Sequence, residues 1–294
     1  MDLLEKFNAV EVTPQNRITE SDKDYCERHQ AAYEAAAGGY AELMRIWTSI
    51  NEKQEECMGE ESDRKRHMYL CARDDLMIRE YSVNRHIENL PSKFISDIVG
   101  YFCDTYSISI SSYAIEQALL KETGAANDES AAATSALRYE SIVDRIFQEM
   151  DGRNFAEYAM YQLKRDCLAA VDFIRSNAYF ERKKAVIRFH GSFCDYTSRS
   201  DWGYNSGYLK WTLTSKMKSI AKALSYLEKG AFGTYPLAVE QFLANKYSCS
   251  EYVILSDCEK LEEMKMYKNG RVDVKFASAA LASEFEETYL KKAA

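Results

Sequence analysis

The stretch Met264-Lys-Met-Tyr-Lys-Asn-Gly-Arg-Val-Asp-Val-Lys-Phe276 contains two runs of alternating apolar and polar residues. Alternation with a period of two is typical of strands that bury one face. Between the two runs, the dipeptide Asn269-Gly270 readily adopts the positive φ angles of a type I′ turn. The sequence therefore predicts a β-hairpin over 264–276, closed by a type I′ turn.

Two further runs, 184–189 and 208–214, alternate in the same way and flank a loop rich in aromatic and turn residues. This pattern predicts two half-buried strands. We expect these strands to form a second hairpin. The two hairpins together then make one antiparallel sheet with helices on one face.

The segment 175–222, which contains both of these runs, is strongly basic. It holds ten Lys and Arg against three acidic residues, a charge of +7, so the rest of a chain with net charge −8 carries −15. Two interpretations are open: the segment stacks bases and contacts phosphates, or it docks on a protein with aromatic anchors and a charged rim. The candidate contact residues are Arg188, Arg199, Trp202, Tyr204, Tyr208 and Lys210.

The first half of the chain has the apolar spacing of long helices. One helical pattern runs over 21–57, with Ser21 or Asp22 as its N-cap, and a second runs over 62–89. A short turn separates the two patterns. The sequence therefore predicts a projecting αα-hairpin arm.

Breaker residues and composition suggest where this helical part ends. Pro91 is expected to end the second helix and to start a third, and the alternation of Ile with Ser over 106–111 predicts a short strand. The small, polar segment 124–135 has the composition of a linker. We therefore expect an α+β protein with a helical domain over 1–123 and an α+β domain over 136–294.

Within the second domain, helices are expected at 136–150, 154–176, 215–229, 236–247 and 279–291, the last of them capped by Ser278.

Composition points to a globular chain with many contact surfaces. Hydrophobic residues make up 46% and charged residues 29%, which is a globular balance. No apolar run approaches the ~18 residues of a membrane span, and the first residues lack the pattern of a signal peptide, so we expect a cytoplasmic protein. The 21 tyrosines and the long arm favour a homo-oligomer.

No catalytic, metal or cofactor motif is visible. The eight cysteines form no CxxC pair, which predicts reduced thiols rather than a zinc site. His190, Cys194 and Asp195 are close in sequence, but no nucleophile elbow or oxyanion loop accompanies them. We therefore expect a protein that is not an enzyme and that binds no cofactor or metal.

Several segments of the second half resemble an uncharacterised domain family of phages, prophages and conjugative elements. The segments that carry this resemblance are Ile142-Val-Asp-Arg-Ile-Phe-Gln-Glu-Met150, Gly152-Arg-Asn-Phe155, Met217-Lys-Ser-Ile-Ala-Lys-Ala-Leu224, Tyr235-Pro236 and Tyr267-Lys-Asn-Gly-Arg-Val-Asp-Val-Lys-Phe276. The resemblance covers about 138–292. The domain also occurs at the tail of some N6-adenine methyltransferases. This chain has neither their Gly-rich cofactor loop nor their Asn/Asp-Pro-Pro-Tyr/Phe motif, so the resemblance implies no methyl transfer.

The family setting implies a role in the conflict between phage and host. In length and layout the chain resembles phage inhibitors of host defence. Such a protein binds a nuclease–helicase complex such as Gabija and blocks its access to DNA or its cleavage. The alternative is a nucleic-acid-binding accessory protein of a mobile element, which uses a basic and aromatic patch at 182–211. The net charge of −8 favours a protein partner, because a negative chain is repelled from DNA.

Overall fold

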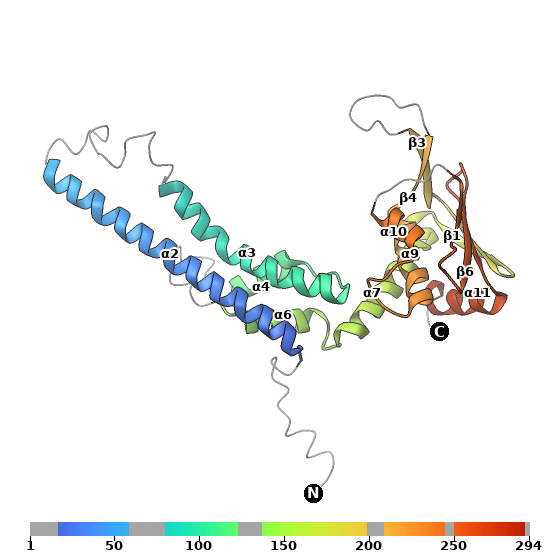
Figure 1. Ribbon diagram of the computed structural model, residues 1–294, viewed down its shortest axis with the longest axis horizontal. Helices are drawn as coiled ribbons and strands as arrows, with labels where there is room; N and C mark the ends of the chain where they lie inside the picture. Colours follow the sequence, from blue (N-terminus) through green and yellow to red (C-terminus); the bar gives the residue numbers. More distant parts are fainter. Residues whose placement is uncertain (1–16, 59–79, 123–136, 199–208, 245–249, 292–294) are drawn as a thin grey trace, which may run out of the picture. The chain divides into compact units, whose positions relative to one another are not determined.

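The computed structural model describes residues 17–58, 80–122, 137–198, 209–244 and 250–291 (Figure 1). Contacts within the chain divide it into two units, Met1–Thr105 with Ser109–Asn154, and Tyr106–Ile108 with Phe155–Ala294. The described part of the first unit is helical, and the strands belong to the second unit. The expected α+β class, in which helices precede an antiparallel sheet with packed helices, is confirmed.

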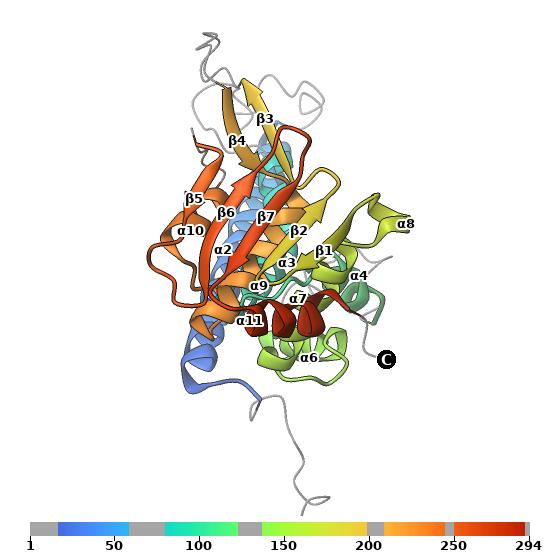
Figure 2. The same ribbon diagram turned by 90° about the vertical axis from the view of Figure 1, so that its right-hand side faces the viewer.

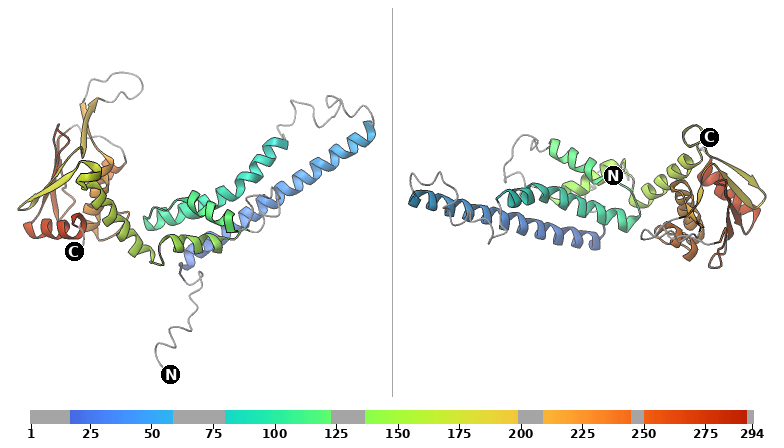
Figure 3. Two further views of the ribbon diagram at one scale, coloured as in Figure 1. Left: turned by 180° about the vertical axis from the view of Figure 1, so that it is seen from behind. Right: turned by 90° about the horizontal axis from the view of Figure 1, so that it is seen from above.

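Two long helices, α2 (Glu20–Met58) and α3 (Glu80–Tyr106), run antiparallel in the first unit (Figure 3). Stacked rings join them, and residues later in α2 meet residues earlier in α3. The ring centroids are 3.8 Å apart for Tyr25 and Tyr101, 4.5 Å for Tyr33 and Phe94, and 5.9 Å for Tyr40 and His86. An antiparallel pair of long helices is therefore present, but its second helix runs over Glu80–Tyr106 and not over the predicted range 62–89, of which 62–79 lie outside the described residues. Its connection, over 59–79, lies outside the described residues.

Helix α2 begins with a reciprocal cap between Thr19 and Asp22. Asp22 Oδ2 accepts a hydrogen bond from Thr19 N at 2.8 Å, and Thr19 Oγ1 accepts one from Asp22 N at 3.2 Å. The hydroxyl of Tyr101 on α3 donates to Asp22 Oδ1 at 2.8 Å. The predicted cap at Ser21 or Asp22 is wrong, because Asp22 caps from the third position of the helix and also binds the neighbouring helix.

Helix α3 continues through Pro91, so the predicted helix end there is wrong. Proline removes one backbone donor and disfavours a helix interior. Around it, however, Phe94, Ile95 and Ile98 of the same helix are buried. Tertiary packing of an apolar face stabilises helices more than local propensity does. The strand expected over 106–111 is also absent, since α3 extends to Tyr106 and the residues after it are irregular.

Helices α4 (Ser112–Glu122) and α6 (Tyr139–Glu149) complete the first unit. Gln30 of α2 holds the start of α6: its Nε2 donates to Leu137 O at 3.0 Å, and its Oε1 accepts from Tyr139 N at 2.8 Å. The expected linker, 124–135, lies outside the described residues. Because α6 packs on α2 and α4, the division between the units differs from the expected domain start at residue 136 and falls after Asn154.

The second unit is built on a five-stranded antiparallel sheet in the order β1-β2-β7-β6-β5, beside a two-stranded sheet of β3 and β4. The strands are β1 (Tyr179–Lys183), β2 (Val186–His190), β3 (Cys194–Ser198), β4 (Leu209–Leu213), β5 (Tyr252–Ile254), β6 (Leu261–Met266) and β7 (Val272–Phe276). The helices are α7 (Phe155–Ala170), α8 (Phe173–Ser176), α9 (Ser215–Lys229), α10 (Leu237–Leu243) and α11 (Ala279–Phe285), which continues as a π turn over Glu286–Leu290.

The two upstream runs form strands β2 and β4, but these strands do not pair with each other. β2 pairs with β1 and β7, and β4 pairs with β3 in the smaller sheet. The predicted pairing is therefore wrong. The sequence pattern did not reveal β1, because it is a charged strand at the sheet edge with little alternation. The helix predicted over 154–176 was also too long, since it breaks between α7 and α8.

The hairpin of β6 and β7 is confirmed, whereas its predicted turn type is wrong. Only Gly270 has a positive φ, of 82°, and Asn269 does not. Gly270 N donates to Tyr267 O at 2.8 Å and Tyr267 N donates to Arg271 O at 2.9 Å, which describes a type I turn followed by a left-handed residue. A Cβ on Gly270 would lie 3.0 Å from the backbone N of Ser192. The turn is thus shaped by the segment packed against it.

The last helix starts as predicted. Ser278 caps α11, with its Oγ accepting from Leu281 N at 3.2 Å. In the following π turn, the buried carboxylate of Glu286 binds Arg182 of β1 and lies 2.8 Å from Lys291 Nζ. Burial raises the pKa of Glu286, but hydrogen bonds from Lys291 and Arg182 outweigh it and hold the pKa below its usual value.

Across the parts of the chain that the structure describes, no helix is both long and apolar enough to cross a membrane.

Candidate functional site

The five-stranded sheet has one buried and one open face. Alternate residues of β2 and β7 fill the core, where Ile187, Phe189, Val274 and Phe276 are fully buried. Figure 2 shows the five strands side by side in front of α9, so the viewer looks at the opposite face. The side chains on this face are charged or aromatic, which agrees with the alternation in the sequence.

A row of opposite charges crosses this open face. Residues directly opposite each other in an antiparallel pair lie on the same side of the sheet. The register therefore lines up, strand by strand, Glu181 of β1, Arg188 of β2, Asp273 of β7, Lys265 of β6 and Tyr252 of β5. We call these five residues, together with Tyr179, His190, Tyr267 and Arg271, the charged face.

Arg188 lies between two carboxylates. Its Nη1 is 3.9 Å from Glu181 Oε2, and its Nε is 3.7 Å from Asp273 Oδ2. The side chain of Arg188 is 31% exposed and that of Asp273 is 13% exposed. Water therefore screens this group less than it screens a surface ion pair. The positive charge of Arg188 is largely compensated before any partner binds.

Asp273 is the centre of a second set of contacts. Arg271 Nε lies 3.0 Å from Asp273 Oδ1, close enough for an ion pair but without the alignment of a hydrogen bond. Tyr267 donates its hydroxyl to Asp273 Oδ2 at 3.2 Å. The guanidinium of Arg271 also stacks on the Tyr267 ring, 3.7 Å from its centroid. Asp273 thus contacts Arg188 of β2, Arg271 directly before its own strand and Tyr267.

Aromatic rings cover the two sides of the charged face. Tyr179 stacks on His190 with 4.6 Å between ring centroids and an interplanar angle of 5°. On the other side, Lys265 Nζ lies 4.6 Å from the ring centroid of Tyr252 and 5.3 Å from that of Tyr267. Rings with a polar edge and ordered cations are frequent at protein interfaces.

The Cys194 thiol, which is close to His190 in sequence, contacts the backbone instead. Burial raises the pKa of the Cys194 thiol to about 11, so this thiol stays protonated at neutral pH. Its Sγ contacts the carbonyls of Tyr267 and Arg271 at 3.4 Å rather than His190. Within the described ranges, no group of three His, Cys, Asp or Glu side chains could hold a metal ion.

The predicted contact residues are only partly described. Arg188 lies on the charged face, while Lys210 lies on β4, in the smaller sheet, opposite Thr197 of β3. Arg199, Trp202, Tyr204 and Tyr208 lie outside the described residues. Trp211 of β4 is buried, in agreement with the alternation of the run 208–214.

Sequence reasoning missed most of the charged face. Lys265, Tyr267, Arg271 and Asp273 are outward positions of the predicted hairpin 264–276, so alternation alone could have placed them together. The pairing of β7 with β2 could not be foreseen, and this pairing brings Arg188 to Asp273.

Comparisons with known protein families, curated proteins and solved structures found no match to this chain.

Proposed function

We propose that this protein is a non-enzymatic phage or mobile-element protein. It binds a host anti-phage defence complex, of which the Gabija nuclease–helicase is the first candidate, and blocks the access of that complex to DNA or its cleavage. It acts in the cytoplasm of the host cell. The proposal rests on the family resemblance of residues 138–292 and on the charged face.

The observation that carries the choice of a protein partner is the pairing of Arg188 with Glu181 and Asp273. Nucleic-acid surfaces need uncompensated cations, because affinity comes from displacing the counterions of phosphates. On the charged face, each of Arg188, Arg271 and Lys265 has a carboxylate within 4.0 Å. Alternating charges among aromatic rings instead match a protein surface of complementary charge pattern.

We also propose that the protein acts as a homo-oligomer through its helical arm. Ile46 and Ile50 of α2 are 43% and 38% exposed. They lie one helical turn apart on the same side, so a second copy could cover both. Light scattering of the purified chain at micromolar concentration tests this point, and a strict monomer both alone and with its partner would exclude it.

The decisive experiment combines the purified protein with a purified Gabija complex and measures DNA cleavage. We expect inhibition by the unmodified chain. The charge reversals Arg188→Glu and Lys265→Glu should weaken it, because each places a negative charge beside existing carboxylates. Lys222→Glu is the matched control, since Lys222 is an exposed lysine of α9 away from the sheet face.

A salt series separates the two interpretations of the basic segment. Tight DNA binding by the protein alone, lost steeply as salt rises, would favour the nucleic-acid-binding alternative. Absence of both complex formation and inhibition would contradict the proposed function for this defence system, and a pull-down from cells carrying other defence systems would then identify the partner.

A further inference from the structure

The sheet has an open edge at β1. β1 pairs with β2 and with no other strand among those described. Ala185 O accepts a hydrogen bond from Phe276 N of β7 at 2.8 Å, so the backbone groups of Ala185 point toward β7. Ile187 lies two residues further on, so its backbone groups also point toward β7 and away from Arg182, its partner on β1. Arg182 and Ile187 are therefore a non-hydrogen-bonded pair, in which both residues direct their backbone groups away from each other. The backbone groups of Arg182, and of Phe180 two residues before it, thus point away from β2, toward the open edge.

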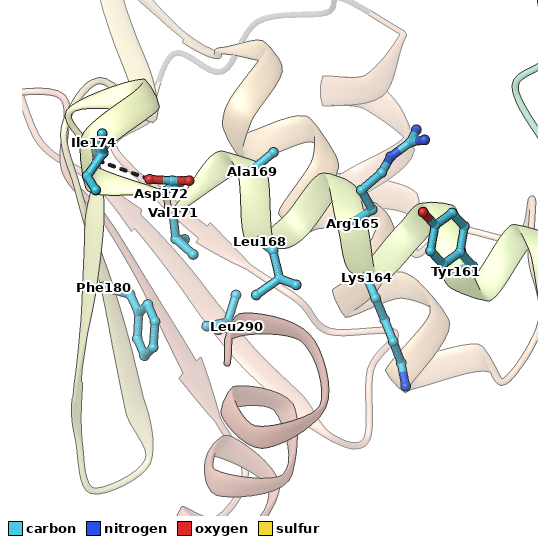
Figure 4. A pocket seen from close by; sticks show the side chains of 10 residues that line it. All are labelled: Tyr161, Lys164, Arg165, Leu168, Ala169, Val171, Asp172, Ile174, Phe180 and Leu290. Atoms are coloured by element: carbon cyan, nitrogen blue, oxygen red, sulfur yellow. Dashed lines mark hydrogen bonds between the residues drawn. The ribbon is translucent and has the colours of Figure 1, made fainter. Parts of the chain in front are cut away.

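An apolar groove of about 580 Å³ adjoins this edge. Figure 4 shows Phe180 of β1, Leu168 of α7 and Leu290 pointing into the same space. A strand added beside β1 would place every second side chain on the side of Phe180, above this groove. The edge and the groove therefore form one feature that offers backbone partners and an apolar site together.

Apolar side chains around the groove are unusually exposed. Ile174 is 94% exposed and Phe173 is 61% exposed in α8, directly before β1, and Tyr161 of α7 is 44% exposed. Exposed apolar residues that gather in one place mark interaction sites on soluble proteins, and Phe173 and Ile174 are adjacent in α8. Covering Ile174 alone would remove a nearly complete isoleucine side chain from water.

The charges at the groove indicate what covers it. The lining of the groove itself includes Lys164, Arg165 and Asp172, so it carries charges of both signs. Lys183 and Lys184 are exposed at the end of β1, and Lys183 lies 3.3 Å from Glu181. In an added strand whose apolar side chains cover the groove, the residues between them lie on the other face of the sheet, on the side of Lys183. Acidic residues at these positions would be complementary to it in charge.

A second copy of the same strand fits this edge less well. Antiparallel pairing of two β1 strands about their midpoint sets Glu181 opposite Glu181 of the second copy. Directly opposed like charges destabilise a sheet. Shifting the register by two residues avoids this clash but shortens an overlap that is only five residues long.

We propose that β1 and its groove dock an extended peptide segment of a partner protein by strand addition. Apolar side chains of this segment alternate with acidic or polar ones, as in other modes of recognition at sheet edges. The main chain pairs with Phe180 and Arg182, and the apolar side chains cover Leu168 and Ile174. The acidic side chains lie on the opposite face of the added strand, on the side of Lys183. This docking site is separate from the charged face, so it stands whether or not the partner is a defence complex.

The test uses fluorescently labelled short peptides in which Val or Ile alternates with Glu or Asp. Their binding to the full chain is measured by fluorescence polarisation without any other protein. We expect saturable binding that Ile174→Asp weakens by about tenfold or more, since it removes one buried aliphatic contact. Lys183→Glu should weaken it as well. The matched control is Ile254→Asp, which changes a 72% exposed isoleucine on β5, the other edge of the sheet, and should leave binding unchanged.

Three results would overturn the proposal. The first is that none of the alternating peptides binds. The second is equal binding by a peptide N-methylated at every second amide, because that peptide cannot add a strand. The third is a dimer of the free protein that Ile174→Asp dissociates, which would assign the edge to a second copy. Since the defence complex is absent from this assay, its outcome is independent of the inhibition experiment.

Discussion

Exchanging Asp273 for asparagine tests the charged face most directly, because it keeps the shape of the side chain and removes its charge. The side chain is 13% exposed, lies near Arg188 and Arg271, and accepts from Tyr267. Interactions with a charged partner contribute about 1.5–3 kcal/mol when buried and aligned. Here one contact is 3.7 Å long and Arg188 is 31% exposed, so we expect a loss of about 1–2 kcal/mol in the free energy of unfolding.

This loss corresponds to a fall in Tm of about 2–8 °C for a unit of this size. Thermal unfolding followed by circular dichroism measures it. Lys275→Gln is the matched control on the same strand and face, because its pair with Glu262 is exposed on both sides and should contribute nothing measurable. The same Asp273→Asn protein should gain salt-sensitive DNA binding, since Arg271 loses its carboxylate and Arg188 keeps only Glu181. An unchanged Tm together with unchanged DNA binding would refute the reasoning that Asp273 compensates these cations.

Three further predictions concern residues outside the charged face. The contribution of Glu286 to stability is complete above the unfolded pKa of about 4.3 and is lost as the pH falls through its lower folded pKa. Glu286→Gln should therefore remove this pH-dependent contribution to the free energy of unfolding, which urea unfolding at several pH values measures. An unaltered pH profile of stability in the variant would contradict this. Gly270→Ala should cost about 1–3 kcal/mol, because φ is 82° and the added Cβ meets a backbone at 3.0 Å. Gly38→Ala, with nothing within 4 Å of its Cβ in α2, should instead stabilise by about 0.5–1 kcal/mol, and urea titration compares the two. Alkylation of the native protein, read by mass spectrometry, should modify exposed Cys57 and spare buried Cys194; equal labelling would contradict the described packing.

Local patterns predicted those parts of the fold that depend on the residues of a single segment. The cap at Ser278, the helix over 215–229 and the hairpin over 264–276 each depend on a few neighbouring residues. These features were correctly predicted, because caps and alternation act over a single turn or strand.

Predictions failed where a distant segment outweighs local preference. Pro91 lies inside α3 because packing around Phe94 holds the helix together, although proline by itself favours a helix start. The Asn269-Gly270 turn is not type I′, because Phe193 N donates to Gly270 O at 2.7 Å and fits the turn to the chain beside it.

For the site, alternation along each strand was enough to place Arg188, Lys265 and Asp273 on the polar side of their strands. Only the tertiary structure decided that they meet. The order β1-β2-β7-β6-β5 places residues 181, 188, 273 and 265 in one row. As a result, Arg188 of the basic segment lies beside the carboxylate of Asp273 from a distant strand. Strand order depends on contacts between segments far apart in the chain, and local periodicity carries no information about those contacts.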